Sequence, residues 1–159
     1  MLIDIVLDTN VLMHADDPRQ PLMQMSRDLL SALQLPTCKT HLCVDEGFDL
    51  DEAKNRSQIG SEYLEHLDFG MLGLAVVAHL AGSLRVKQVS RAVPPHVSKK
   101  IYTQVPKGPD RTFLKVAFNA ADKTLACHDF GDVPAPVRTR LQRAIGVHVL
   151  DATAALARL

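Results

Sequence analysis

The sequence predicts an α/β domain: a three-layer α/β/α sandwich whose central, mainly parallel sheet has four to five strands. The first observation is a nearly unbroken apolar run, Ile3, Ile5, Val6 and Leu7, which is typical of a strand buried on both faces. The second is that short apolar runs alternate with segments of helical periodicity along the chain. The third is the length, which fits one domain covering residues 1–159.

Later strands are predicted where short apolar runs end in polar residues. Residues 84–89 alternate between apolar and basic side chains, which predicts an edge strand or an extended arm. The other strands are expected at residues 40–44, 124–127 and 147–150. Helices are expected at residues 22–33, 60–67, 71–80, 110–121, about 132–144 and from 152 onward.

Two segments are expected to be loops. Residues 46–57 are polar and acidic, and residues 90–109 contain four prolines with lysines between them. Long polar segments interrupted by proline usually run over the surface of a domain.

The charges are unevenly distributed although the formal net charge is zero. Residues 45–68 are rich in acids, and residues 85–115 are rich in lysine and arginine. Two interpretations remain open at this point. The segments are either two solvated faces that partly pair with each other, or a basic rim that holds a phosphate backbone beside an acidic, metal-binding centre.

The cysteines and the absence of targeting patterns favour a soluble cytoplasmic protein without membrane contact. Three cysteines without a CxxC pair suggest buried thiols in a reducing compartment. Asp4 and Asp8 interrupt the first apolar run, so it does not resemble a signal peptide. The most apolar later stretch, residues 71–81, is too short to span a membrane.

Acidic side chains follow three of the predicted strands, at Asp8, Asp45 and Asp129. Asp8 alone could equally be the cap of a following helix. However, parallel strands share one carboxyl edge, where open α/β sheets bind their ligands, so these acids can converge. Asp110 in the first turn of one helix and Glu62 near the start of another can join them.

Several carboxylates around one small space repel each other unless a cation lies among them or some are protonated. Ligation by oxygen atoms alone is what Mg²⁺ and Mn²⁺ prefer. Ions held in this way polarise a phosphate and activate a water molecule. The acids therefore predict a metal-dependent hydrolase that acts on phosphodiester bonds.

Four motifs resemble those of the PIN-domain nucleases in order and spacing, over essentially the whole chain. They are Asp8-Thr9-Asn10-Val11-Leu12, Glu62-Tyr63, Asp110-Arg111 and His128-Asp129-Phe130. The resemblance implies the three-layer α/β/α fold and cleavage of RNA, less often of DNA flaps, with Mg²⁺ or Mn²⁺. It also implies that Asp8, Glu62, Asp110 and Asp129 are the catalytic metal ligands, and that Asn10 orients Asp8 through a hydrogen bond.

The second acid has competitors, because Glu46 and Glu52 are also available. Glu62 is preferred because the segment 59–63 resembles the corresponding helix of the family, whereas Glu46 lies in a polar turn.

Four further residues have open roles. His128 could bind metal or substrate, but a half-buried histidine with a local partner is favoured. Asp132 is either a fifth ligand or, as favoured, the N-cap of the next helix. Asp45 is read as a turn former, and Asp122, at a helix end, as exposed.

The resulting functional hypothesis is an endoribonuclease that acts on single-stranded or structured RNA. Basic residues would position the RNA backbone, and these are Lys99, Lys100, Lys107, Arg111 and Lys115. The small size fits the toxin of a toxin–antitoxin pair, with an antitoxin protein as partner, and the resemblance is compatible with a homodimer. The alternative is a PIN-fold module that binds nucleic acid or protein with little or no nuclease activity.

Overall fold

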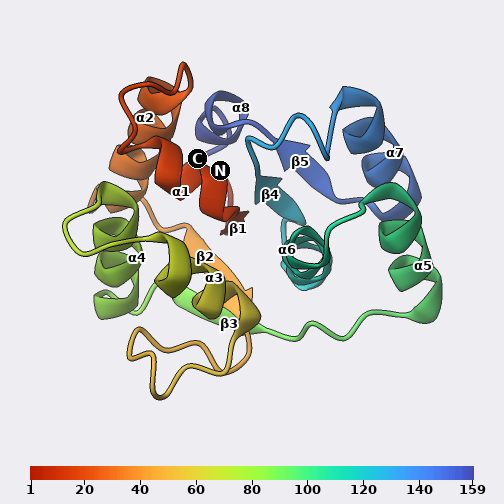
Figure 1. Cartoon of the computed structure of the whole chain (residues 1–159), viewed down its shortest axis with the longest axis horizontal. Helices are drawn as coiled ribbons and strands as arrows, with labels where there is room; N and C mark the ends of the chain where they lie inside the picture. Colours follow the sequence, from red (N-terminus) through yellow and green to blue (C-terminus); the bar gives the residue numbers. More distant parts are fainter.

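The computed structural model describes residues 1–159 as five strands and eight helices (Figure 1). The strands are β1 (Asp4–Leu7), β2 (His41–Asp45), β3 (Val86–Val89), β4 (Thr124–Ala126) and β5 (His148–Leu150). The helices are α1 (Thr9–His14), α2 (Met23–Gln34), α3 (Gln58–His66), α4 (Leu72–Gly82), α5 (Pro95–Gln104), α6 (Gly108–Asn119), α7 (Ala135–Ile145) and α8 (Ala152–Leu156).

The five strands form one parallel sheet in the order β3-β2-β1-β4-β5, which confirms the predicted sheet. The central strand β1 pairs with β2 through Ile5 and Leu42, and with β4 through Leu7 and Ala126. The chain first builds the sheet outward from β1 to β3, and then returns to add β4 and β5 on the other side. The strand order therefore reverses between β1 and β4, which makes this point the topological switch point.

Helices cover both faces of the sheet, as predicted for a three-layer sandwich (Figure 1). Helices α1, α2, α4 and α8 pack together on one face, and α5, α6 and α7 on the other. Helix α3 contacts both α1 and α6, so it connects the two helical layers beside the sheet. This distribution follows from right-handed crossovers, which place helices on opposite faces when the direction of strand addition reverses.

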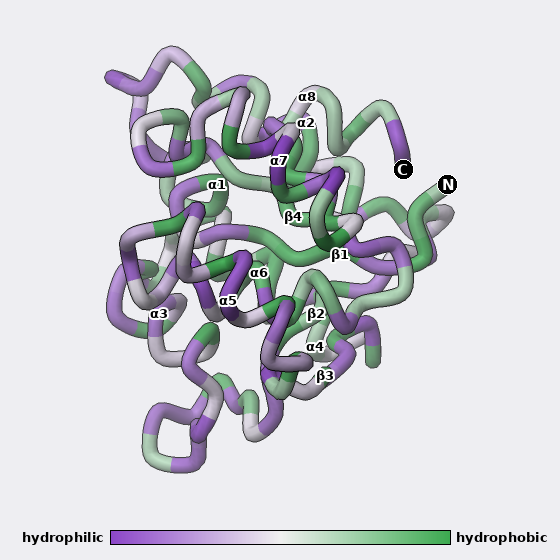
Figure 2. The backbone as a smooth tube through the Cα atoms, turned by 90° about the vertical axis from the view of Figure 1, so that its right-hand side faces the viewer, coloured by the Kyte–Doolittle hydropathy of each residue, from purple (hydrophilic) through white to green (hydrophobic).

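The core lies on both sides of the central strands, where Ile5, Val6 and Leu7 are completely buried. Figure 2 shows the strands as mainly hydrophobic and the outer loops as mainly hydrophilic. The exception is Asp4, which is buried at the start of β1 and accepts hydrogen bonds from the backbone N–H groups of Ala121 and Asp122. Asp122 in turn accepts from the N–H groups of Ile3 and Asp4, so the prediction that it is exposed was wrong.

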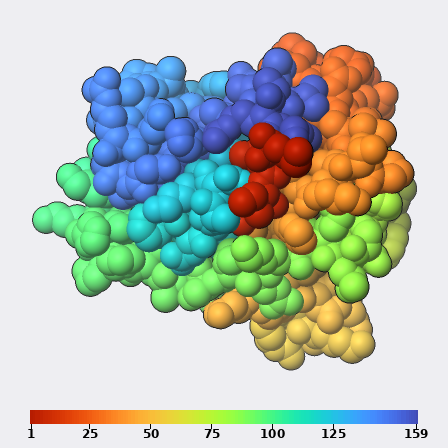
Figure 3. Space-filling model, turned by 180° about the vertical axis from the view of Figure 1, so that it is seen from behind, coloured from red at the N-terminus to blue at the C-terminus, as the bar shows by residue number.

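One predicted loop contains a helix. Residues 90–109 were expected to be irregular, but α5 occupies Pro95–Gln104 and buries Val97 and Ile101. Proline does not prevent this helix because Pro95 lies in its first turn. Backbone N–H groups in the first turn have no acceptor within the helix, so the helix loses no hydrogen bond at proline. By contrast, residues 46–57 form a loop as predicted, and this loop projects from the body of the molecule (Figure 3).

The two ends of the chain lie side by side (Figures 1 and 3). The N–H group of Leu2 donates to the carbonyl of Arg158 at 2.9 Å. None of the helices combines the length and the apolar character that crossing a membrane requires.

Candidate metal centre

The candidate site lies at the carboxyl ends of β1 and β4, the two strands at the switch point. Asp8 directly follows β1, and its N–H group continues the sheet by donating to the carbonyl of Ala126 in β4 at 2.9 Å. Asp129 follows β4 after two residues. The fold therefore brings together two acids that are far apart in sequence, at the edge where such sheets bind ligands.

Three carboxylates form a close group there: Asp110 from the first turn of α6, and Asp129 and Asp132 from the loop between β4 and α7. One carboxylate oxygen from each lies within 4.8 Å of the others. Asp8 lies close enough to this group for its negative charge to raise the pKa of Asp110. The charge of Asp129 in turn raises the pKa of Asp8. The structure thus unites three of the four predicted ligands and adds Asp132.

The electrostatics of the group favour the binding of a cation. Burial, followed by the charges of Asp8 and Asp129, raises the pKa of Asp110 to about 6. Burial likewise raises the pKa of Asp8. The Oδ2 atom of Asp110 is buried and accepts no hydrogen bond. A buried carboxylate oxygen without a partner, among other carboxylates, is a suitable ligand for Mg²⁺ or Mn²⁺, so the donor set fits these ions.

The loop that carries Asp129 and Asp132 is held rigidly. The carboxylate of Asp129 accepts hydrogen bonds from the N–H groups of Gly131 at 3.1 Å and Asp132 at 2.8 Å. Arg138 of α7 donates to the carbonyls of Val133 at 2.7 Å and Cys127 at 3.0 Å, one at each end of the loop. The positions of both acids are therefore set before any ion binds.

The side chain that restrains Asp8 is Cys127, which sequence reasoning did not identify. The Cys127 thiol donates to Asp8 Oδ2 at 3.0 Å, and its sulfur accepts from the N–H group of Asp129 at 3.3 Å. Burial, with the nearby Asp8 charge, raises the pKa of this thiol, so it stays protonated and remains a donor. The side-chain oxygen of Asn10 accepts from the N–H group of His128 at 3.0 Å, and it is the backbone N–H group of Asn10 that hydrogen-bonds to Asp8 and lowers its pKa.

Asp132 is not a helix cap, which corrects the favoured interpretation. The N-cap of α7 is Pro134, and no side chain caps this helix. The Asp132 carboxylate instead forms an ion pair with Lys107, the residue that precedes α6. The sequence signal for a shared site is the three-residue spacing of Asp129 and Asp132, because a tight turn brings both side chains onto the same side of the loop.

Glu62 lies outside the close group of aspartates. Its carboxylate is grouped with Glu65 and His66 on α3, and its Oε2 atom lies 3.6 Å from His66 Nε2. Glu62 does border a groove that also touches Gly108 and Pro109, the residues before Asp110. The competing residues Glu46 and Glu52 are exposed in or beside the projecting loop and belong to neither acidic group.

Two polar residues near the site have structural roles. Asp45 is completely buried and accepts from the N–H groups of Gln58 at 2.7 Å and Ile59 at 2.9 Å, so it anchors the start of α3. His128 is buried rather than half-buried, and its partner is not local, because its Nε2 accepts from the N–H group of Ala152 at 3.1 Å. His128 therefore connects the end of β4 to α8 and has no free nitrogen directed at the acids.

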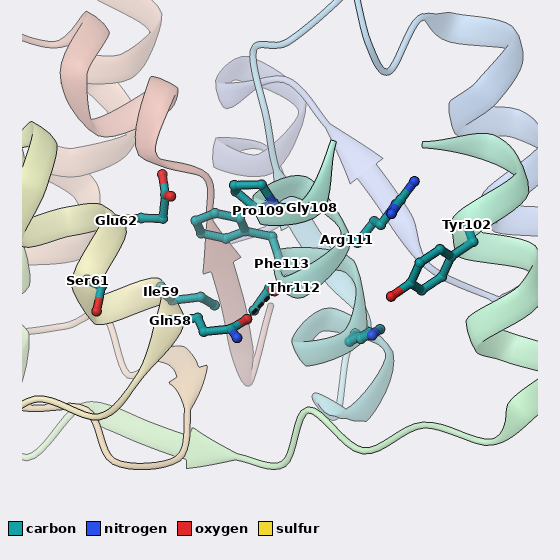
Figure 4. Close-up of a pocket in the computed structure, with 11 residues that line it drawn as sticks. Gln58, Ile59, Ser61, Glu62, Tyr102, Gly108, Pro109, Arg111, Thr112 and Phe113 are labelled. Atoms are coloured by element: carbon teal, nitrogen blue, oxygen red, sulfur yellow. Dashed lines mark hydrogen bonds between the residues drawn. The ribbon is translucent and has the colours of Figure 1, made fainter. Parts of the chain in front are cut away.

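The predicted basic residues divide into three sets. Arg111 and Lys115 line a groove of about 500 Å³ that crosses α6 between α3 and α5 (Figure 4). Lys107 pairs with Asp132, inside the acidic group. Lys99 and Lys100 are exposed on α5 and do not line the groove.

The chain matches no protein-family profile, no curated protein and no solved structure.

Proposed function

We propose that this chain is a PIN-like nuclease that hydrolyses RNA phosphodiester bonds with Mg²⁺ or Mn²⁺. The observation that supports this proposal best is the group of Asp110, Asp129 and Asp132 within 4.8 Å, with Asp8 beside it, at the switch point of a parallel sheet. Lys107 is the only cation paired with the group, and it reaches Asp132 alone. The other carboxylates keep oxygens that can bind an ion.

Asp8, Asp110, Asp129 and Asp132 are the proposed ligands. A divalent ion at such a site polarises the phosphate and makes a nearby water molecule more acidic. The protein itself contributes preorganisation: Cys127 fixes one oxygen of Asp8, and Arg138 fixes the loop of Asp129. Glu62 is left out of this ligand set because its carboxylate belongs to a separate group on α3.

Two basic residues of α6 that pair with no carboxylate supply the complementary charge for the substrate. Arg111 follows Asp110 directly, and Lys115 lies one helical turn further along α6. Both line the groove, so the charge of a phosphate bound there is partly neutralised. In this proposal an RNA strand runs from the groove to the acidic group, since Arg111 directly follows Asp110 in α6.

Asp8→Asn is the direct test of the proposed function. The substitution keeps the size of the side chain but removes a charge, so cleavage of single-stranded RNA in Mn²⁺ should fall by at least about a hundredfold. Gel analysis of a labelled oligonucleotide measures the rate, and circular dichroism confirms that the variant folds.

Asp68→Asn is the matched control, because Asp68 is an exposed acid that neither lines the groove nor belongs to either acidic group. It should cleave like the unaltered protein. Undiminished cleavage by the Asp8 variant would contradict the proposal. If the unaltered protein cleaves no nucleic acid and Mn²⁺ does not change its melting temperature, the alternative of a binding module is favoured. The toxin–antitoxin setting stays a prediction.

A further inference from the structure

The groove across α6 has two chemically different walls (Figure 4). Its floor is made by residues on one face of α6, including Gly108, Thr112 and Phe113. Gln58 and Glu62 of α3 form one wall. Tyr102 of α5 forms the other, where Arg111 and Lys115 approach its ring.

The cations on the Tyr102 side have no anionic partner within the protein. Arg111 and Lys115 pair with no carboxylate, although the chain has equal numbers of acidic and basic residues. Arg111 is nevertheless held in place, because its Nε donates to the carbonyl of Val105 at 2.8 Å and its guanidinium lies 4.1 Å from the centre of the Tyr102 ring. Its terminal nitrogens remain available to bind an anion such as phosphate.

Tyr102 presents an aromatic surface to solvent. Its side chain is 53% exposed, although an aromatic ring gains by burial, and its hydroxyl forms no hydrogen bond within the protein. The guanidinium of Arg111 already covers one face of the ring, so a base can stack only on the exposed opposite face. An exposed ring beside unpaired cations is the combination that stacks a base and binds its phosphate.

The opposite wall offers hydrogen-bonding groups. Gln58 is fixed through its side-chain oxygen, which accepts from the Thr112 hydroxyl at 2.7 Å, so its amide nitrogen is left as a donor. Glu62 contributes carboxylate acceptors on the same wall. These groups offer a donor and an acceptor to RNA that lies in the groove.

We propose that this groove binds an unpaired nucleotide of single-stranded RNA, with the base stacked on Tyr102 and its phosphate at Arg111 and Lys115. The identity of the ligand as RNA rests on the proposed function, and the groove defines the substrate class as single-stranded. Bases in a duplex are covered by their neighbours on both faces and cannot stack on a side chain in a groove wall. Pro109 and Arg111, the neighbours of Asp110 in α6, both line the groove.

Binding without metal tests this proposal separately from catalysis. Fluorescence anisotropy in EDTA measures the affinity for a 12-nucleotide single-stranded RNA, a length of about one protein site. Tyr102→Ala should weaken binding by about tenfold or more, and Tyr102→Phe should bind within about twofold of the unaltered protein. Phe69→Ala removes another exposed ring, outside the groove, and should have no effect.

A spectroscopic readout detects the stacking itself. A 2-aminopurine placed in the oligonucleotide should lose emission on binding to the unaltered protein and to Tyr102→Phe, but not to Tyr102→Ala. The preference for single-stranded RNA over a duplex of the same sequence should also shrink in the alanine variant. Equal affinity and equal quenching in Tyr102→Ala would overturn the proposal, as would a failure of the unaltered protein to bind single-stranded RNA.

The outcomes for the groove and for the proposed function are distinguishable. If Tyr102→Ala loses RNA binding but the unaltered protein cleaves nothing in Mg²⁺ or Mn²⁺, the groove proposal stands and the nuclease proposal fails. If the unaltered protein cleaves RNA and Tyr102→Ala binds it normally, the nuclease proposal stands and the groove proposal fails.

Discussion

At the scale of single residues, Asp110 shows the conflict between stability and the proposed function. Its carboxylate is partly buried, lies near three other acids and leaves one oxygen without a hydrogen bond. Such an environment disfavours the charged form, so without a cation the folded protein is destabilised by this residue at neutral pH. Functional sites commonly retain groups of this kind at a cost in stability.

Asp110→Asn should therefore stabilise the metal-free protein. The pKa of Asp110 is raised to about 6 from 3.8, so the folded state carries a penalty that grows between these pH values and is complete above pH 6. Allowing for partial exposure, removal of the charge should add about 1 to 2 kcal/mol to the free energy of unfolding at pH 8, and nothing near pH 4. Urea denaturation in EDTA measures this difference.

The same variant should lose the response to metal. Mn²⁺ should raise the melting temperature of the unaltered protein by mass action, and the rise should be much smaller in Asp110→Asn. Asp68→Asn again serves as the control and should behave like the unaltered protein. A metal-free Asp110→Asn protein that is less stable at pH 8 would contradict this account of the acidic group.

At the scale of elements, α3 is positioned by buried polar contacts rather than by its apolar residues alone. The carboxylate of Asp45, at the end of β2, accepts hydrogen bonds from the first two N–H groups of the helix and from the Ser57 hydroxyl. Tyr63 donates its hydroxyl to the carbonyl of Leu7 at 2.6 Å, which ties the helix to the end of β1. These contacts fix the wall of the groove that carries Gln58 and Glu62.

Asp45→Ala should destabilise the protein severely. The change leaves the donors at the start of α3 buried without an acceptor, which should lower the free energy of unfolding by about 3 to 5 kcal/mol. Chemical denaturation measures the loss. Glu52→Gln alters an exposed acid in the adjacent loop and should change stability by less than about 0.5 kcal/mol. Similar values for the two variants would show that Asp45 does not anchor α3.

At the scale of the whole molecule, His128 joins elements from both halves of the chain. It follows β4, accepts from Ala152 at the start of α8, and places its Nδ1 at 3.1 Å from the Nδ1 of His14 in α1. Burial, followed by the charge of His14, lowers the pKa of His128 to about 4. Burial also lowers the pKa of His14. The folded protein therefore holds both rings neutral under conditions in which the unfolded chain binds protons.

Global stability should fall as the pH falls from about 6.5 to about 4. In this range His128 is protonated in the unfolded chain but stays neutral in the folded protein. Its titration therefore lowers the free energy of unfolding by up to about 3 kcal/mol. Asp110 acts in the opposite direction over part of the range, so the comparison uses His128→Gln, which lacks the titrating ring. The pH dependence of the melting temperature should be flatter in this variant, and an equally steep dependence would contradict the prediction.

Sequence patterns alone predict the α/β class, the parallel sheet and three acids of the candidate centre, Asp8, Asp110 and Asp129. Strand composition and the acid after each strand are local features, and the shared carboxyl edge of a parallel sheet converts them into a spatial prediction. Three features become visible only in the fold: the place of Asp132 in the acidic group, the hydrogen bond from Cys127 to Asp8 and the separate position of Glu62. These depend on turn geometry and on how helices pack against one another, which no local pattern of residues specifies.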